Sequence, residues 1–220
     1  MLDIINTYVP DLIILFLTCS VLFSLLYLKK LNTPFRRLFY FLIWNLIIEI
    51  LAIVFTSLGH NNLPLLHIYT LGEFVLFSYF FISIITSPRL FRTLFWWFVR
   101  IGVLFIIINS LIFQSIYDFN TYAKSFSQVS IIGYAVMYFY NLVATNSFAS
   151  DTIKSLRLIN SAILIYYSGS LFIFMYGRSM EVNEWYIMLW AFNAVLNLIF
   201  HLLIFIGLWK AFYKRSTLSL

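Results

Sequence analysis

Long apolar stretches alternate with short polar connections along the whole chain. A helix crosses the hydrocarbon core of a bilayer, about 30 Å thick, with near 20 residues, and seven stretches reach that length. In chain order they cover residues 10–28, 38–58, 65–86, 94–116, 125–147, 158–176 and 186–209. Pro10, Pro34, Pro64 and Pro88 fall at or between the ends of these stretches, where a missing N–H is harmless. The pattern predicts seven transmembrane helices, none with an interior proline.

The composition agrees with a membrane protein. Hydrophobic residues make up 63% of the chain and charged residues only 10%, whereas soluble domains carry about 25% charged residues. We therefore expect an all-α, polytopic membrane protein in which residues 1–220 form a single seven-helix domain, with no soluble domain. The first apolar stretch has no small-residue cleavage pattern, so we expect it to be kept as an anchor.

The distribution of basic residues predicts the orientation. The first, third and fifth connections and the C-terminal tail carry or adjoin twelve of the 14 Lys and Arg residues, whereas Lys124 and Arg178 are on the other side. Short loops rich in Lys and Arg face the cytoplasm. The N-terminus is therefore expected outside and the C-terminus in the cytoplasm, and we expect the bacterial inner (plasma) membrane as the location. Arg100, one to two turns into the fourth stretch, is expected to extend its side chain toward the cytoplasmic face.

Two glutamates lie deep inside predicted helices. At 1.5 Å per residue, Glu73 is about 12 Å and Glu49 about 13 Å below the outer edge of the membrane. A charged side chain in hydrocarbon costs at least about 2.5 to 3.5 kcal/mol, so carboxylates at this depth suggest a function by default. If the two approach closely, one of them is expected to keep its proton, as coupled acids do.

Polar residues of the second and seventh stretches reach the same depth. Asn193, Asn197 and His201 recur every four residues and so share one helix face, with Asn197 about 16 Å below the outer edge. Asn45 lies one turn from Glu49, near the expected level of His201. Hydrogen bonds between helices, each contributing about 0.6 kcal/mol, would account for the asparagines alone but not for the glutamates. The predicted ligand-binding residues or polar core are Asn45, Glu49, Glu73, Asn193, Asn197 and His201.

Motifs for metal, cofactor or nucleophile chemistry are missing from the sequence. His60 and His67 form at most an outer rim of the polar site, and Cys19 is the single cysteine. No HxxxH or HExxH spacing, Walker loop, dinucleotide fingerprint or nucleophile elbow occurs. A lysine in the middle of the last stretch, which a retinal pigment needs, is also missing. We therefore assign no metal, no cofactor and no catalytic residue.

Three classes of function fit these residues. We favour a seven-helix sensor or receptor-like module that binds a small or lipidic ligand and signals through a separate membrane or cytoplasmic protein. A membrane-embedded enzyme that acts on a lipid or isoprenoid by carboxylate acid-base chemistry is the alternative. A small-solute or proton transporter ranks third, because transporter helices are commonly broken by Gly or Pro. The expected partners are the lipid bilayer and another protein, with no nucleic acid, and the sequence permits an oligomer.

Overall fold

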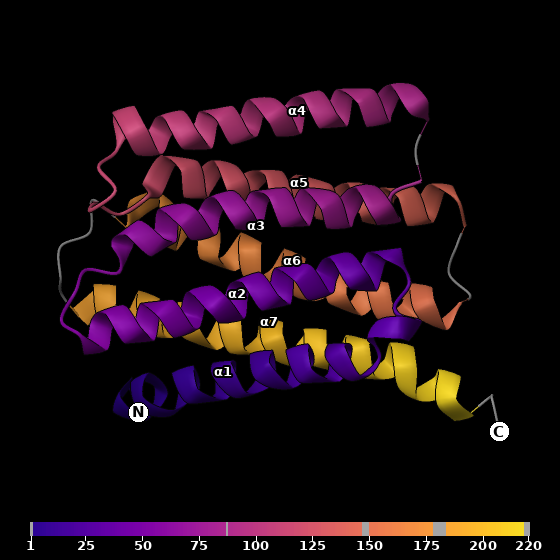
Figure 1. Cartoon of the computed structure of the whole chain (residues 1–220), viewed down its shortest axis with the longest axis horizontal. Helices are drawn as coiled ribbons and strands as arrows, with labels where there is room; N and C mark the ends of the chain where they lie inside the picture. Colours follow the sequence, from indigo (N-terminus) through magenta and orange to yellow (C-terminus); the bar gives the residue numbers. More distant parts are fainter. Residues whose placement is uncertain (1, 87, 147–149, 178–183, 218–220) are drawn as a thin grey trace.

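The computed structural model describes residues 2–86, 88–146, 150–177 and 184–217, and these ranges contain helices and no strand. Seven helices are each long and apolar enough to cross a bilayer (Figure 1). They are α1 (Leu2–Leu26), α2 (Thr33–Ser57), α3 (Leu63–Ile84), α4 (Arg89–Ile108), α5 (Thr121–Ala144), α6 (Asp151–Tyr176) and α7 (Glu184–Thr217). A short 3₁₀ helix, η1 (Leu28–Lys30), follows α1, and a π-helix, η2 (Asn109–Phe113), continues α4. The expected all-α fold with seven helices able to span a membrane is confirmed, and it indicates an integral membrane protein.

Most helices begin before the apolar stretch that predicted them, because their first turns are polar. The side chain of Asn32 accepts the backbone N–H of Phe35, with Pro34 in the first turn of α2. Ser150 accepts the N–H of Ile153 in the same way at the start of α6. Such caps satisfy N–H groups that have no partner within the helix. The expectation that no proline is interior was wrong for Pro10, which lies inside α1 because that helix begins at Leu2.

Six helices form a closed ring, and one lies outside it. The main contacts join α1 to α2, α2 to α3, α3 to α5, α5 to α6, α6 to α7 and α7 back to α1. Helix α4 packs mainly on the outer side of α3 and lies at the edge of the bundle in Figure 1. The interior of the ring is therefore bordered by helices that are far apart in the sequence.

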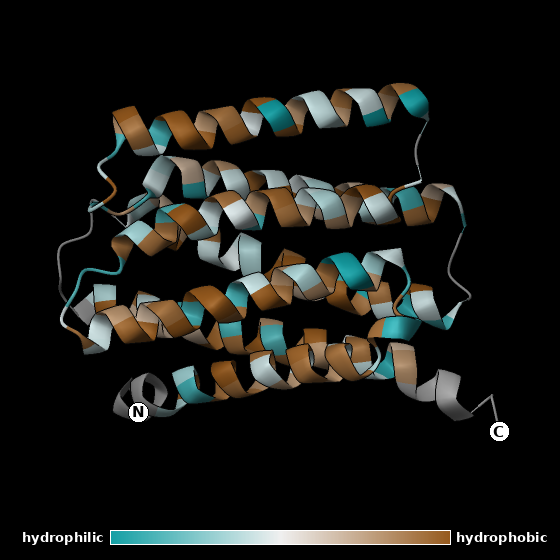
Figure 2. Cartoon of the chain, in the orientation of Figure 1, coloured by the Kyte–Doolittle hydropathy of each residue, from teal (hydrophilic) through white to brown (hydrophobic). Residues whose placement is uncertain are grey.

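Hydrophobic residues recur along all seven helices, with hydrophilic residues between them (Figure 2). Most of the basic residues in the described ranges gather at one end of the bundle. At this end α1, α3, α5 and α7 end and α2, α4 and α6 begin, while the beginning of α1 lies at the opposite end. The end where the basic residues gather is called the basic end, after Lys29, Lys30, Arg36, Arg37, Arg89, Arg92, Lys154, Arg157 and Lys210. The opposite end is called the N-terminal end.

Four aromatic rings close the interior of the helix ring toward the basic end. Phe41 of α2, Phe77 of α3, Tyr167 of α6 and Phe200 of α7 are at most 2% exposed. Neighbouring ring centroids are 4.2 Å apart for Phe41 and Phe77, 5.5 Å for Phe77 and Tyr167, and 6.1 Å for Tyr167 and Phe200, and 6.3 Å separates Phe200 from Phe41. These spacings are typical of favourable aromatic pairs. We call these four residues the aromatic layer.

The close contact of α2 with α3 requires a glycine, which gives a first prediction. A Cβ atom added at Gly72 would lie 2.2 Å from Cε2 of Trp44, whereas one added at Gly133 in α5 has no neighbour within 4 Å. Overpacking costs about 1 to 3 kcal/mol, while alanine favours a helix over glycine by about 1 kcal/mol. Gly72→Ala should therefore lower the melting temperature of the purified protein, and Gly133→Ala should keep or raise it. Equal melting temperatures for the two variants would contradict this view of the α2–α3 contact.

Candidate functional site

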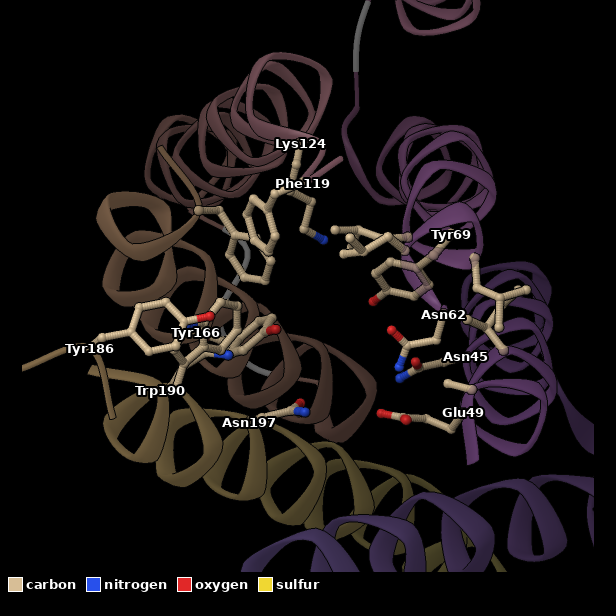
Figure 3. Close-up of a pocket in the computed structure, with 17 residues that line it drawn as sticks. Asn45, Glu49, Asn62, Tyr69, Phe119, Lys124, Tyr166, Tyr186, Trp190 and Asn197 are labelled. Carbon is tan, nitrogen blue, oxygen red and sulfur yellow. The ribbon is translucent and has the colours of Figure 1, made fainter. Parts of the chain in front are cut away.

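A cavity of about 450 Å³ lies inside the ring, between the aromatic layer and the N-terminal end. It is partly open, and helices α2, α3, α5, α6 and α7 contribute to its wall (Figure 3). Its polar side chains are those of Asn45, Glu49, Asn62, Tyr69, Lys124, Tyr166, Tyr186, Trp190, Asn193 and Asn197. The volume is within the range of small-molecule sites, which are also concave, largely apolar and fitted with a few polar groups.

Four of the residues expected from the sequence line this cavity together. Asn45 and Glu49 come from α2, one turn apart, and Asn193 and Asn197 come from α7 with the same spacing. Residues four apart share a helix face, so each helix presents two polar groups to the same space. In Figure 3 the side chains of Glu49 and Asn197 extend into the cavity from opposite sides.

His201 lies directly beneath the cavity and joins α7 to α2. It is fully buried, and its Nε2 atom is 3.2 Å from Nδ2 of Asn45. The asparagine amide donates this hydrogen bond, so Nε2 is the acceptor and the proton of the neutral ring is on Nδ1. Nδ1 has no partner in the described part of the chain. Asn45 and His201 thus form the polar bottom of the cavity, next to Phe200 of the aromatic layer.

Glu73 is fully buried, but its partners are not those that the sequence analysis considered. Nζ of Lys124 donates to both carboxylate oxygens, at 2.8 Å to Oε1 and 2.7 Å to Oε2. The hydroxyl of Tyr167 donates to Oε1 at 2.7 Å, and that of Ser127 to Oε2 at 3.3 Å. No contact with Glu49 is recorded among the described residues. The expected sharing of a proton with Glu49 is therefore replaced, for Glu73, by an ion pair that joins α3 to α5 and by a hydrogen bond to α6.

Lys124 is 1% exposed and also lies over two aromatic rings. Its Nζ atom is 4.5 Å from the ring centroid of Tyr69 and 5.0 Å from that of Phe174. We had counted Lys124 as a residue of an outer connection, because the apolar stretch begins only at residue 125. Helix α5 begins one turn earlier, so the lysine points into the ring. The spacing of Lys124, Ser127 and Gln128, which places them on one helix face, was the signal that could have revealed this.

A buried cluster of amide side chains holds the connection between α4 and α5 in place. This connection leads directly to Lys124. Nδ2 of Asn109 donates to Oε1 of Gln114 at 3.0 Å and to Oδ1 of Asn120 at 3.2 Å. Asn120 in turn donates to Oγ1 of Thr70, at 3.3 Å, and so attaches the connection to α3. The connection also positions Phe119 at the mouth of the cavity, where its ring stacks on Phe174 at 5.7 Å and meets Trp190 at 5.8 Å. We call Phe119, Phe174 and Trp190 the aromatic rim.

The two histidines expected at an outer rim lie away from this cavity. His67 is buried between α3 and α4, where Nδ1 is 2.9 Å from Oγ of Ser110 and Nε2 is 3.2 Å from the carbonyl oxygen of Asp118. His60 is exposed and contacts the ring of Phe55. Neither residue is among those that line the cavity. The contacts of both histidines join segments that are neighbours in the structure.

The cavity has polar groups that find no partner in the described part of the protein. Oδ1 of Asn193 and Nε1 of Trp190 are buried without a hydrogen bond among the described residues, and Glu49 makes no recorded hydrogen bond or ion pair there. A buried polar group without a partner is costly, so such groups mark a place where water or a ligand completes the bonds. Since Lys124 and Glu73 are paired with each other, Glu49 is the carboxyl group that the cavity offers to an occupant.

In the described ranges, no group of three or more His, Cys, Asp or Glu side chains is arranged to hold a metal ion. Comparison of the chain with protein-family models, curated proteins and solved structures finds no match. The fold and the site therefore define a class only, that of seven-helix integral membrane proteins with a polar cavity inside the bundle. The geometry of this cavity is what points to a function.

The buried ion pair gives a second prediction. Replacing Glu73 by Gln leaves the Lys124 ammonium group buried without a counter-charge, and removing one partner of such a pair typically costs about 3 to 5 kcal/mol. Glu73→Gln should therefore strongly lower the melting temperature and the yield of folded protein. The double variant Glu73→Gln/Lys124→Met should recover a large part of the loss, because it removes both charges.

The exposed ion pair of α6 provides the matched control. Nζ of Lys154 lies 3.0 Å from Oδ1 of Asp151, and their side chains are 58% and 48% exposed. Exposed pairs contribute about 0 to 1 kcal/mol, so Lys154→Gln should change the melting temperature little. If Glu73→Gln lowers the melting temperature no more than Lys154→Gln does, the buried ion pair is not a main support of the bundle.

Proposed function

We propose that this protein is a sensor or receptor-like module of the membrane, which binds a small ligand in the cavity and acts on a separate protein partner. The observation that carries the proposal is a partly open cavity inside the ring, lined by polar groups of which some have no hydrogen-bond partner in the described part of the chain. These features favour reversible binding of a ligand that supplies the missing hydrogen bonds and fills the space.

The aromatic layer argues for binding rather than passage. Phe41, Phe77, Tyr167 and Phe200 contact one another in a closed circuit beneath the cavity and are buried completely or almost so. Further buried phenylalanines, Phe35, Phe81 and Phe212, lie in the core toward the basic end. A transporter needs a second route to the other side, and this packing offers none without a large rearrangement. A small-solute or proton transporter therefore remains the least favoured function.

The chemistry of the cavity favours a ligand with a positively charged or hydrogen-bond-donating group. Glu49 supplies an acceptor without a protein partner, and Asn45, Asn193 and Asn197 can each donate and accept. Tyr69, Tyr166 and Trp190 add aromatic faces to the wall, which attract cations and apolar groups alike. An organic amine with an apolar body matches these features.

The orientation and the location belong to the same proposal. We propose that the N-terminal end faces outward and the basic end faces the cytoplasm of a bacterium, across its inner membrane. Lys124 is buried against Glu73 and so no longer counts as a basic residue of an outer loop, which supports the assignment. The cavity would then take its ligand from outside the cell.

The ring connects the cavity to the surfaces where a partner could bind. Helices α2 and α7 line the cavity and continue to the basic end, so a shift of Asn45, Asn197 or His201 on binding would extend along both helices. We propose a membrane or cytoplasmic protein as the partner at the basic end or on the lateral surface. For a signal to result, the ligand must bind one conformation of the protein more tightly than the other.

A membrane-embedded enzyme that acts on a lipid or isoprenoid is the second candidate. The free carboxylate of Glu49 favours it, because a general base needs a group that is not committed to another bond. Glu73 argues against it, since Lys124, Tyr167 and Ser127 hold both of its oxygens. Product formed by the purified, partner-free protein would favour the enzyme over the sensor.

A third prediction tests access to the cavity. A cysteine in place of Asn197, in a Cys19→Ala background, should react in intact cells with a small impermeant cationic methanethiosulfonate, because the cavity opens outward. Glu49 should make this reaction about ten times faster than that of an anionic methanethiosulfonate, since a charged cleft concentrates counter-ions. Glu49→Gln should remove this difference.

Three further cysteines serve as controls for access. Ser57→Cys, at the exposed end of α2, should react in intact cells, and Lys154→Cys should react only after the membrane is opened. Phe200→Cys, in the aromatic layer, should not react from either side. Labelling of Lys154→Cys in intact cells would reverse the proposed orientation, and reaction of Asn197→Cys from the cytoplasmic side alone would refute outward access.

The fourth prediction concerns binding and signalling together. Small organic amines, of which phenethylamine is a first probe, should raise the melting temperature of the purified protein in a saturable way, because a ligand that binds only the folded state stabilises it. Glu49→Gln should abolish the increase and keep the melting temperature without ligand, since Glu49 makes no hydrogen bond or ion pair with the described residues. His60→Gln, which removes an exposed group that does not line the cavity, is the matched control and should respond like the parent.

Cross-linking at the basic end completes this test. A photoreactive residue at position 154 should capture a defined membrane or cytoplasmic protein, and the yield should change when the amine is added. If the amine binds but does not change the cross-linking yield, the protein only binds the amine, and the sensor proposal is refuted. Saturable uptake of the amine into vesicles would favour transport instead.

A further inference from the structure

A groove on the outside of the ring carries two arginines at the depth of the lipid tails and headgroups. Two adjoining hollows, of about 360 and 530 Å³, share Val75 and Tyr79 of α3. Helix α2 borders the first with Arg37 and Tyr40, and α4 borders the second with Trp96 and Arg100. The outer face of α3 is thus the floor of one groove, with α2 and α4 as its walls. This groove is separate from the cavity inside the ring.

Arg100 is the less expected of the two arginines. It is exposed on α4 and lies eleven residues, about 16 Å, from the beginning of that helix, well beyond the first turn where basic residues usually meet water. Its guanidinium carbon is 5.1 Å from the ring centroid of Trp97, one turn nearer to the basic end. In the described part of the chain it makes no recorded hydrogen bond or ion pair. A charge in this position needs an anionic partner or a path to the headgroups.

Arg37 faces the same groove from the other wall. Its guanidinium donates a hydrogen bond to the carbonyl oxygen of Tyr79 and lies 5.6 Å from the ring centroid of that residue. Arg37 is four residues, about 6 Å, from the beginning of α2, at the level of the headgroups. The bond to Tyr79 uses only part of its donors, because a guanidinium carries five N–H groups. Arg37 is therefore held over the groove with donors to spare.

We propose that the groove binds one anionic phospholipid from the leaflet at the basic end. The phosphate lies between Arg37 and Arg100, each of which can donate two parallel hydrogen bonds to it. An acyl chain runs over Val75, Leu76 and Val103, which line the apolar part of the groove. Among the described residues no carboxylate lines either hollow, so no opposite charge there attracts the cationic headgroup of a zwitterionic lipid.

The position of α4 gives this lipid a structural role. Because α4 lies outside the ring and packs mainly on α3, the wall that it forms depends on few contacts within the protein. A lipid held by Arg37 of α2 and Arg100 of α4 joins two helices that have few or no direct contacts. The site would therefore act as a bridge between the ring and its outer helix.

Native mass spectrometry of the full chain, released from nanodiscs of equal parts phosphatidylglycerol and phosphatidylcholine, tests the proposal. The parent should retain one phosphatidylglycerol in clear excess over phosphatidylcholine. Attraction of an anionic lipid to one nearby basic residue corresponds to about a fivefold preference, so Arg100→Gln should lower the ratio of the two adducts by about that factor. Arg100→Lys should keep part of the preference, because it keeps the charge but not the paired donors.

Arg92→Gln is the matched control, since Arg92 is exposed on the same helix and borders neither hollow. It should leave the ratio unchanged. An equal loss in Arg92→Gln would mean diffuse attraction to the basic end and would overturn the site, as would equal adducts in the parent or no change in Arg100→Gln. Arg37→Gln should also lower the ratio, which tests the second wall. If millimolar inorganic phosphate displaces the lipid, the arginines bind a soluble anion, and the proposal of a lipid site is refuted.

Discussion

The ion pair of Glu73 with Lys124 is the interaction on which the arrangement of the bundle depends. It joins α3 to α5 through two side chains that are at most 1% exposed, so each charge depends on the other for its compensation. Tyr167 extends the link to α6 and is at the same time a member of the aromatic layer. The depth of the ion pair thus also sets the depth at which the cavity ends.

The number of helices could be predicted from the sequence because hydropathy measures the property that a bilayer selects. The boundaries could not, since the first turns contain charged residues such as Arg36 and Lys154, which are helical without being apolar. For the same reason Lys124 was counted with a loop. Hydropathy also gives no reason for a helix to continue through Pro10.

The depth of a residue was more predictable than its direction. A rise of 1.5 Å per residue placed Asn45, Glu49 and Asn197 within one region of the membrane, and the structure has them around one cavity. Glu73 is at a similar depth, yet its side chain is engaged by α5 and α6, which the sequence analysis had not connected with it. Which helices are neighbours depends on the closed ring, and that order cannot be read from periodicity within single helices.

Unpartnered polar atoms are not confined to the cavity. Amide oxygens of Gln128 and Asn160 also lack a partner among the described residues, although both side chains donate across helix contacts, to Ser170 and to the backbone of Ala135. What distinguishes Glu49, Asn193 and Trp190 is that they border open space. An occupant can reach them without separating any helices.

The proposed access from the N-terminal end alone has a consequence for what occupancy of the cavity can report. An occupant would then exchange with only one of the two compartments that a bilayer separates. The fraction of occupied molecules would follow the concentration on that side and would not depend on the concentration on the other. Phe119, Phe174 and Trp190, which line the cavity in mutual ring contact, are the residues whose movement would change the rate of this exchange.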